Sequence, residues 1–290
     1  MVDHLAPGLR RVLAPNPGPL TGPGTNSYIV GTGTVAVIDP GPDDPAHLAA
    51  LEAALGPDER ISHIVVTHAH RDHAPLARIL GARQGAPVAA FGDARAGRNP
   101  AWDALGDLGG GEGVDSTFAP DLTLPDGAVI EGPDWRLQAI WTPGHMGNHI
   151  CLRWGDAVFS GDHVMGWATS VVSPPDGDMA AYMASLDRLA TLPARVFHPG
   201  HGAPVADPAA RVADLIAHRR GREAQILAAL TPQPQPIRHL TERVYADLSP
   251  TLIPAAERNV LAHLLDLCAR GLARADPAPH PAARYATPRP

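Results

Sequence analysis

The stretch Thr67-His68-Ala69-His70-Arg71-Asp72-His73 follows directly on the apolar run Ile64-Val65-Val66. A β-branched run predicts a strand, and at the end of a strand residues i and i+2 point to the same side. The first two histidines of the stretch can therefore meet at one point. The turn after them can bring the aspartate and the third histidine to a second point nearby. Three imidazoles and a carboxylate at this spacing favour a divalent metal such as zinc.

Three later motifs place a histidine or an aspartate directly after a glycine. They are Thr142-Pro143-Gly144-His145, Phe159-Ser160-Gly161-Asp162 and Pro199-Gly200-His201-Gly202. Each lies at the C-terminal end of a predicted strand, where sheets gather ligands, and the glycine lets the backbone pass close to a bound ion. Any one of these motifs alone could be a simple turn. Together with the first stretch they supply the seven ligands that a two-metal site would use.

The composition supports ligands that use nitrogen and oxygen. The chain has 290 residues and 15 histidines, and all 23 of its basic residues are arginine. The absence of lysine excludes Schiff-base chemistry, pyridoxal-phosphate attachment and a P-loop. The two cysteines, Cys151 and Cys268, lie too far apart for a thiolate cluster or a disulfide framework. We therefore expect two zinc ions, with iron or manganese as alternatives for the same donor set.

The N-terminal sequence and the lack of a long apolar segment predict a cytoplasmic protein with no membrane partner. Residues 1–20 contain Asp3 and six residues that are proline or glycine, so they lack the apolar run of a signal peptide. No segment reaches the roughly 18 apolar residues of a membrane span.

The formal net charge is −7, but residues 211–290 hold 11 arginines against 7 acidic residues, a net charge of +4. The two parts of the chain are expected to face different partners.

Short β-branched runs separated by glycine and proline turns dominate the first two thirds of the chain. Strands are predicted at residues 28–30, 35–38, 64–67, 88–91, 137–142, 150–154, 158–160 and 195–197, and helices at 45–55, 76–83 and 179–192. Because strands and helices mix without strict alternation, the pattern predicts a layered α/β (α+β) fold rather than a doubly wound sheet. Helices are also expected at 209–230, 237–248 and 254–272, with a stiff proline connector at 231–236 and a frayed tail over 276–290.

The order of these motifs resembles the metallo-β-lactamase superfamily, whose hallmark is an HxHxDH run followed by a histidine, an aspartate and a histidine on later loops. The resemblance covers residues 15–207 and implies an αββα sandwich with the metals at one edge. It also implies how the ligands divide between two zinc ions. One zinc would be held by His68, His70 and His145, and the other by Asp72, His73 and His201. Asp162 would bridge the two ions. Asp39 matches an early aspartate of the family that orients a ligand, and a helix or turn cap is the alternative interpretation.

Outside the metal motifs, the chain is similar to the beta-lactamase-like protein 2 group. The similarity rests on residues 17–30, 142–152, 159–171, 218–227 and 255–271. It implies a metallo-β-lactamase-type catalytic domain over residues 1–207, a connecting helix over 208–231 and a small winged-helix-like domain over 232–290. The animal member of the group is a single-strand endoribonuclease, so the resemblance also implies an RNA substrate.

The implied chemistry is metal-dependent hydrolysis. A hydroxide bridging two zinc ions would attack a phosphoryl or acyl centre while the metals stabilise the developing charge. Asp72 or Asp162 could accept the proton. His149, four residues after a ligand, is the candidate for protonating the leaving group, and a solvent-exposed strand residue is its alternative interpretation.

Two enzyme classes and one non-enzyme remain for the function. An endoribonuclease would use the cluster Arg219, Arg220 and Arg222 to contact phosphates, although these arginines could also form a solvated helix face. A thioester or lactone hydrolase resembling glyoxalase II fits the acidic catalytic part better. A DNA-binding module is disfavoured, because structural zinc is closed at four ligands. The bridging aspartate argues against β-lactamase activity, since zinc β-lactamases carry Cys or Ser there. The C-terminal helices could instead form a homodimer surface.

Overall fold

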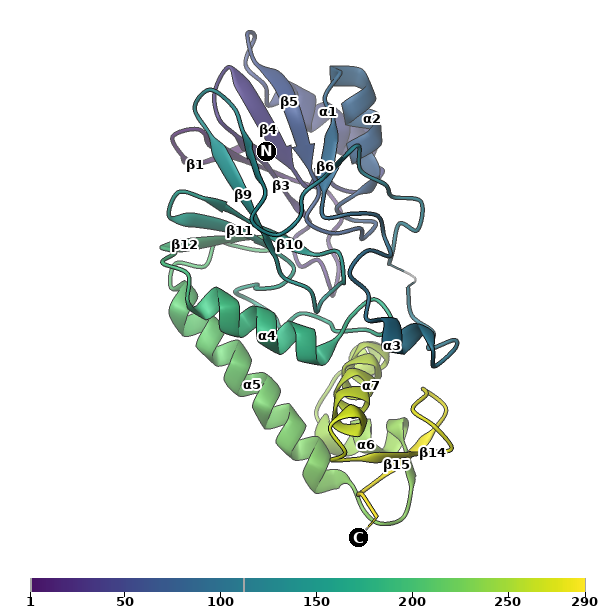
Figure 1. The fold of residues 1–290 in the computed structure, drawn as a ribbon. Coiled ribbons are helices and arrows are strands. Elements are labelled where there is room, and N and C mark those ends of the chain that lie inside the picture. The colour runs from purple at the N-terminus through teal and green to yellow at the C-terminus, as the bar shows by residue number, and fades with distance from the viewer. Residues whose placement is uncertain (1, 112, 290) are drawn as a thin grey trace.

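The computed structural model describes residues 2–111 and 113–289, and it places two sheets face to face with helices on their outer sides (Figure 1). The first sheet has seven strands in chain order, antiparallel from β1 to β4 and parallel from β4 to β7. Its strands are β1 (Val2–Ala6), β2 (Leu9–Leu13), β3 (Asn26–Val30), β4 (Thr34–Ile38), β5 (Arg60–Val65), β6 (Val88–Ala90) and β7 (Leu122–Thr123).

The second sheet has five strands in the order β12-β11-β10-β9-β8. β11 and β12 are parallel, and the other neighbours are antiparallel. The strands are β8 (Val129–Glu131), β9 (Arg136–Trp141), β10 (Ile150–Trp154), β11 (Ala157–Gly161) and β12 (Val196–Pro199). β9, β11 and β12 therefore end at the same edge of this sheet, where the three glycine motifs lie.

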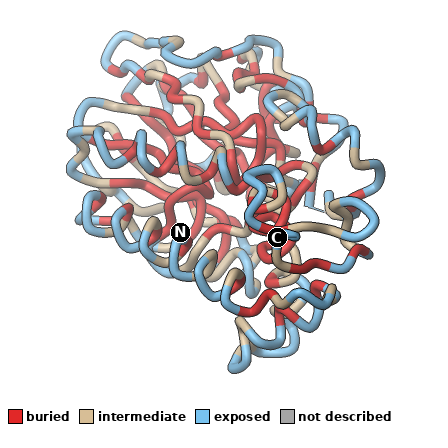
Figure 2. The backbone as a smooth tube through the Cα atoms, turned by 60° about the horizontal axis from the view of Figure 1, so that its bottom comes forward, coloured by how far each residue is buried: buried red, intermediate tan, exposed pale blue. Residues whose placement is uncertain are grey.

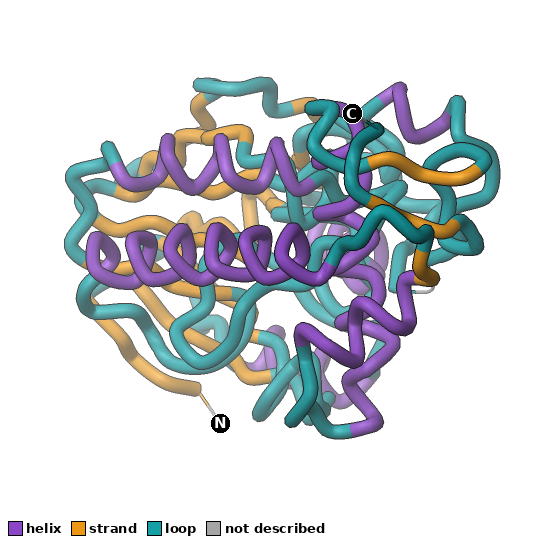
Figure 3. Tube along the Cα trace, turned by 90° about the horizontal axis from the view of Figure 1, so that it is seen from below, coloured by secondary structure: helices purple, strands orange, loops and turns teal. Residues whose placement is uncertain are grey.

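Helices cover the outer face of each sheet because strand residues alternate between two cores. In β4, Val35 and Val37 face α1 (Pro45–Ala53) and α2 (Pro75–Gln84), whereas Ala36 and Ile38 face the second sheet. The second sheet packs in the same way on α4 (Met179–Ala190) and α5 (Pro208–Ala229), which run side by side (Figure 3). The αββα sandwich expected from the sequence is confirmed, and Figure 2 shows the buried backbone concentrated in its central layers.

Aspartates set the start of three helices. Asp44, Asp178 and Asp207 each accept hydrogen bonds from backbone amides in the first turn of α1, α4 and α5, respectively. An oxygen acceptor at the N-cap satisfies amides that have no partner within the helix. The three helices accordingly begin within one residue of their predicted positions.

The C-terminal part forms a small domain of helices and a three-stranded sheet. It contains α6 (Ile237–Val244), the 3₁₀ helix η1 (Pro250–Leu252) and α7 (Ile253–Ala269), with a sheet in the order β13-β15-β14. The sheet strands are β13 (Gln235–Pro236), β14 (Arg274–Asp276) and β15 (Arg284–Ala286). The prediction of a frayed tail is therefore wrong, because β15 pairs with both neighbours and Tyr285 is buried among α6 and α7.

One further helix, α3 (Pro100–Asp103), lies in the catalytic half and packs its Trp102 into the core of the C-terminal domain. No helix among residues 2–111 and 113–289 is long and apolar enough to cross a membrane.

Candidate metal centre

The seven predicted ligands lie together at the edge of the sandwich where β5, β9, β11 and β12 end. Their nitrogen and oxygen atoms form three overlapping groups in which every candidate ligand atom is within 4.8 Å of the others. The groups are His68, His70 and His145; His68, His73 and Asp162; and Asp72, His73 and His201. The structure thus brings all seven residues to one place, and their binding of metal stays a prediction.

Three imidazoles converge in the first group. His68 Nε2 lies 2.9 Å from His70 Nδ1, and His145 Nε2 lies 3.0 Å from the same atom. Burial lowers the pKa of His68 and His145, and it lowers the pKa of His70 to about 3. Neutral imidazole is the form that ligates a metal.

Asp162 lies between the two outer groups. Its Oδ2 is 3.3 Å from His201 Nε2 and 3.8 Å from His145 Nε2, and its Oδ1 is 3.5 Å from His73 Nε2. His201 Nε2 also lies 3.2 Å from Asp72 Oδ2. One carboxylate thus faces ligands of both groups, which is the position that a bridging ligand needs.

Hydrogen bonds on the far side of four rings fix which nitrogen faces the cluster. In the neutral form of each ring, which is the form that ligates a metal, Nδ1 donates to an oxygen and Nε2 keeps its lone pair. The four pairs are His68 with Thr67 Oγ1 at 3.0 Å, His73 with Asp39 Oδ2 at 2.9 Å, His145 with the Val171 carbonyl at 2.6 Å, and His201 with the Gly24 carbonyl at 3.2 Å. Converging lone pairs with few protons between them suit a cation, so these residues fit a metal centre.

The carboxylates raise the pKa values of the histidines in the group of Asp72, His73 and His201. Burial by itself would lower the pKa of His73, but Asp72, Asp162 and Asp39 outweigh it and raise that pKa well above its ordinary value. Burial also opposes protonation of His201, whose pKa Asp162 nevertheless raises to about 10. The local field therefore favours cations at this end of the site.

Asp39 contacts a ligand directly. Its Oδ2 accepts from His73 Nδ1 and from Thr67 Oγ1, while its Oδ1 accepts from the Thr67 amide at 2.7 Å. Asp39 follows β4 rather than preceding a helix, and its side chain is almost fully buried. Of the two interpretations of this residue, the geometry supports the one in which it orients a ligand.

His149 does not line the cavity, so its position does not support the predicted role as an acid. Its side chain has 0 % exposure, its Nδ1 donates to Thr142 Oγ1 at 2.9 Å, and its Nε2 accepts from the Asp162 amide at 3.2 Å. Both nitrogens are thus engaged away from the cavity, and burial holds the pKa well below its ordinary value. The solvent-exposed alternative is also wrong. His149 instead holds the backbone of Asp162.

The three clustered arginines do not form one cationic surface. Arg219 has 1 % exposure and donates to Asn259 Oδ1 and to the Ser170 carbonyl. Arg222 stacks on Tyr245, with its Cζ 4.2 Å from the centroid of the ring, and its Nη1 donates to the Val244 carbonyl at 2.8 Å. Arg220 alone is exposed. The prediction of a shared phosphate-binding surface is wrong at Arg219, because long-range packing buries it.

Several residues that support the site were not predicted from the sequence. Thr67 links Asp39 to His68, and Thr25 Oγ1 donates to Asp72 Oδ2 at 3.4 Å. Asn26 donates to the Pro199 carbonyl beside the loop of His201. The available signal is a Thr-Asn-Ser run inside an otherwise apolar strand, since buried polar side chains need partners.

Residues 20–201 match the Metallo-beta-lactamase superfamily, and residues 237–284 match the Beta-lactamase associated winged helix domain. The helix α5 lies between the two matched regions. The Beta-lactamase-like protein 2 homologs of Caenorhabditis elegans and Drosophila melanogaster are 31% and 32% identical to this chain. These alignments cover 93% and 94% of this chain and 88% and 92% of the relatives.

Fungal relatives align over a shorter region. The Lactamase-like protein nscB of Trichophyton rubrum is 31% identical, and the Atrochrysone carboxyl ACP thioesterase of Aspergillus fumigatus is 32% identical. Both alignments cover 79% of this chain, which spans 65% and 67% of those proteins.

Two solved structures align with nearly the whole of this chain. A metallo-beta-lactamase family protein from Thermus thermophilus has a TM-score of 0.78 and 27% identity, with 98% of this chain and 100% of that chain covered. A beta-lactamase domain protein from Burkholderia ambifaria has a TM-score of 0.80 at 21% identity, covering 99% of this chain and 93% of that chain, which shows a shared fold. A third structure, solved in a di-iron-bound form, has a TM-score of 0.50 and 29% identity over 68% of this chain and 93% of that chain. The chain therefore belongs to the metallo-beta-lactamase superfamily of hydrolases and joins its catalytic domain to a beta-lactamase-associated winged helix domain.

Proposed function

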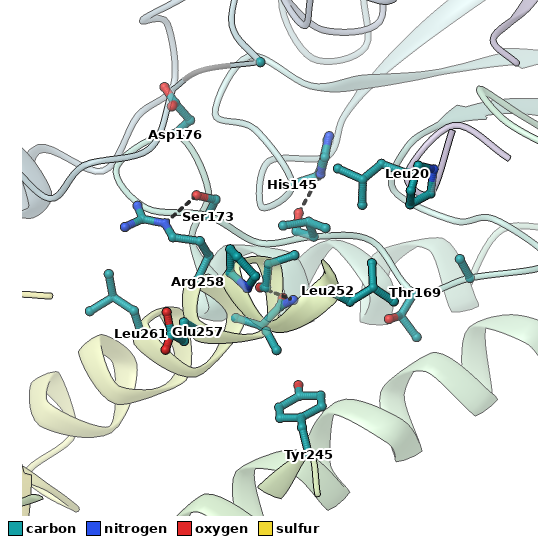
Figure 4. Close-up of a pocket in the computed structure, with 18 of the residues that line it drawn as sticks. Leu20, His145, Thr169, Ser173, Asp176, Tyr245, Leu252, Glu257, Arg258 and Leu261 are labelled. Carbon is teal, nitrogen blue, oxygen red and sulfur yellow. Dashed lines mark hydrogen bonds between the residues drawn. The ribbon is translucent and has the colours of Figure 1, made fainter. Parts of the chain in front are cut away.

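We propose that this hydrolase cleaves acyl thioesters or related esters whose acyl group is apolar. The observation that carries the proposal is a cavity of about 1080 Å³ that runs from the metal centre to the winged-helix domain. Figure 4 shows His145 and Leu20 on the catalytic side of this cavity and Leu252 and Tyr245 on the winged-helix side. A cavity of this size can enclose a substrate of several hundred cubic ångströms.

Beyond the ligands, several apolar side chains line the cavity wall. They include Leu20, Met165, Trp167, Leu248, Leu252 and Leu261. Transfer of an acyl chain from water to this wall would make the binding free energy more favourable by about 0.8 kcal/mol for each methylene group. A substrate with a carbonyl at the metal centre and an apolar chain toward the winged-helix domain would fit both ends of the cavity.

The cations along the cavity already have partners. Arg222 is held by Tyr245 and the Val244 carbonyl, and Arg238 Nε lies 2.7 Å from Glu242 Oε1. Arg258 Nε donates to Ser173 Oγ at 2.8 Å. Nucleic-acid binding depends mainly on cations that are available to phosphates. We therefore prefer an acyl substrate and keep single-stranded RNA as the second candidate, since Arg222 and Arg238 do line the cavity and Arg220 is exposed.

The name of one relative supports the same preference. The Aspergillus fumigatus protein is called an acyl carrier protein thioesterase, and it aligns with this chain over 240 residues. Lactones remain within the proposed class, because they present the same acyl carbonyl.

The seven residues of the centre would hold two metal ions, one at His68, His70 and His145 and one at Asp72, His73 and His201, with Asp162 shared. Bound divalent metals would polarise the acyl oxygen and lower the pKa of water. We expect zinc, with iron or manganese as alternatives for this donor set, and the di-iron-bound structural relative supports considering iron. Elemental analysis of the purified protein decides the metal.

The chain's own groups have separate tasks in the proposed reaction. Water adds its oxygen to the acyl carbon, the bond from this carbon to sulfur breaks, and the products are a carboxylic acid and a thiol. The Asp72 side chain is 27% exposed and lines the cavity, so it is placed to receive a proton from water. A thiol has an ordinary pKa of about 8.5, so it can leave as a thiolate without protonation by an acid such as His149.

The test is a parallel assay of the metal-loaded protein on acetyl, butanoyl, hexanoyl and octanoyl thioesters of N-acetylcysteamine, a homoserine lactone and single-stranded RNA. We expect kcat/KM to rise up to about fourfold for each added methylene, which corresponds to about 0.8 kcal/mol. The variant His68→Ala should lose this activity. RNA cleavage together with thioester rates that do not depend on chain length would overturn the proposal in favour of the ribonuclease.

A further inference from the structure

Residues 170–172 contact two of the predicted metal ligands. The Val171 carbonyl accepts the Nδ1 proton of His145 at 2.6 Å. Ser170 Oγ donates to the backbone carbonyl of Asp162. Because the first bond sets the direction of the His145 ring and the second fixes the loop that carries Asp162, movement of this short segment would move both ligands.

The same segment is held from the other side by two helices that follow the catalytic domain. Arg219 of α5 donates through Nη2 to the Ser170 carbonyl. Asn259 of α7 accepts the Val172 amide proton on its Oδ1 at 3.0 Å, and Arg219 Nη1 donates to the same oxygen at 3.2 Å. The two side chains thus form a closed set of hydrogen bonds around residues 170–172.

Arg219 is expected to lower the stability of the fold at this position. It has 1 % exposure, and in the described part of the chain no carboxylate forms an ion pair with it. Its guanidinium lies 5.1 Å from the centroid of the Tyr182 ring, and its Nε has no hydrogen-bond partner there. A buried charge without a counter-ion destabilises a fold relative to an apolar side chain of the same size. Stability alone therefore does not account for an arginine at this position.

We propose that Arg219 and Asn259 are positioning residues for the metal centre. They fix residues 170–172, which in turn orient His145 and the loop of Asp162. Since α7 belongs to the winged-helix domain, that domain is a structural part of the metal centre as well as a wall of the cavity. The inference rests on the proposed function only in requiring that the centre bind metal.

The experiment compares zinc affinity, measured by competition with a chromophoric chelator, in wild type and four variants of the full chain. Asn259→Leu and Arg219→Met remove the hydrogen bonds, and we expect each to weaken zinc binding by about 10- to 100-fold, as for other groups that orient a ligand. Asn259→Asp keeps the Oδ1 acceptor and should stay within about threefold of wild type. The matched control is Arg270→Met, because Arg270 joins α7 to Glu223 of α5 at 2.6 Å on the surface, away from residues 170–172.

A second readout separates positioning from a general loss of structure. In cobalt-loaded protein the visible absorption bands report the geometry of the ligands around the metal. These bands should change in Asn259→Leu but not in Arg270→Met, and the two variants are compared at temperatures equally far below their melting temperatures. If Asn259→Leu kept the zinc affinity and the cobalt spectrum of wild type, the inference would be overturned. If Arg219→Met fails to fold, the comparison of Asn259→Leu with Asn259→Asp is sufficient to test the inference. A wild-type chain that binds no metal would instead overturn the proposed function, so the two failures are distinguishable.

Discussion

Asp39 shows at the scale of one residue how the site constrains the backbone. Among the described residues it is the one non-glycine with a positive φ, at 49°. Aspartate and asparagine tolerate this left-handed conformation better than other side chains, and such a conformation persists where the surroundings hold it. Here the carboxylate accepts from Thr67 and His73, so the unusual backbone places one acceptor group against two parts of the metal centre.

The variant Asp39→Asn tests this role without changing the backbone preference. An asparagine amide can accept from the Thr67 amide, but it cannot also accept the Nδ1 proton of His73, so it favours the tautomer with the proton on Nε2. A protonated Nε2 cannot ligate, and we expect metal affinity to fall by about 10- to 100-fold. The measurement is a zinc titration against a chelator. Asp126→Asn, at an exposed carboxylate paired with Arg188, is the control, and equal affinity in both variants would contradict the assignment.

Gly200 provides a second residue-scale prediction. A Cβ atom at this position would lie 2.4 Å from Asp162 Oδ1 and 2.7 Å from His73 Cε1. Gly200→Ala should therefore displace two ligands and lower both metal content and activity at least about tenfold. Gly221 offers a matched control, because its Cβ would meet nothing within 4 Å and it lies inside α5. Gly221→Ala should keep metal binding and raise the unfolding free energy by up to about 1 kcal/mol. Normal metal content in Gly200→Ala would show that the loop can adjust.

At the scale of elements, the sequence predicts what depends on local pattern. The eight predicted strands and the main helices are present, because apolar runs, glycine turns and N-cap aspartates act within a few residues. β1 and β2 were not predicted, since Arg10 and Arg11 interrupt the apolar pattern and find partners at Glu59 and Asp3 only in the folded sheet. β15 was not predicted, because prolines lie on both sides of it in residues 276–290.

Residues whose role is set by distant contacts were the least predictable part of the site. The seven candidate ligands, which the structure brings together, follow from spacing within four short motifs. The burial of His149 and of Arg219 depends on partners as remote as Asp162 and Ser170, so local pattern alone predicts the wrong surroundings for both residues.

The helix α7 is buried on more than one side, because it packs both in the winged-helix core and against the catalytic domain. His263 lies in this helix with 1 % exposure, and neither ring nitrogen has a partner in the described structure. Burial lowers its pKa to about 3, assisted by Arg219, Arg270, His218 and Arg222. The folded pKa lies below the unfolded value, so the unfolded chain binds more protons between these values and stability falls as the pH falls.

His263→Leu should remove this dependence on pH. Relative to wild type, the variant should gain unfolding free energy by about 1.4 kcal/mol for each pH unit below 6.5, with the gain ending near the folded pKa. Urea unfolding of both proteins at about pH 7 and about pH 5 measures the difference, in which the shared ligand histidines cancel. A difference that stays constant with pH would show that His263 has the same pKa in the folded and the unfolded chain.

For the whole molecule, the charge asymmetry has a structural explanation. Several arginines of the basic C-terminal part donate into the catalytic domain: Arg211 to the Met165 and Ala168 carbonyls, Arg219 to Ser170, and Arg258 to the Leu108 carbonyl. Part of the positive charge therefore attaches α5 and the winged-helix domain to the catalytic domain. This use of the arginines agrees with an interdomain cavity whose wall includes several apolar side chains.

The cavity leads to the last prediction, which concerns the winged-helix side alone. Leu252 of η1 lines the cavity and lies far along the chain from every ligand. Leu252→Asp places a carboxylate beside the proposed acyl chain, so KM for the octanoyl thioester should rise by about tenfold or more, equivalent to about 1.4 kcal/mol. The acetyl thioester, whose short chain does not reach this wall, should change by less than about threefold. Leu272→Asp, at a leucine that is 43% exposed and does not line the cavity, is the control and should leave both KM values unchanged. If Leu252→Asp raised KM equally for both substrates, the acyl chain would not lie against the winged-helix domain, and the substrate would have to be held within the catalytic half.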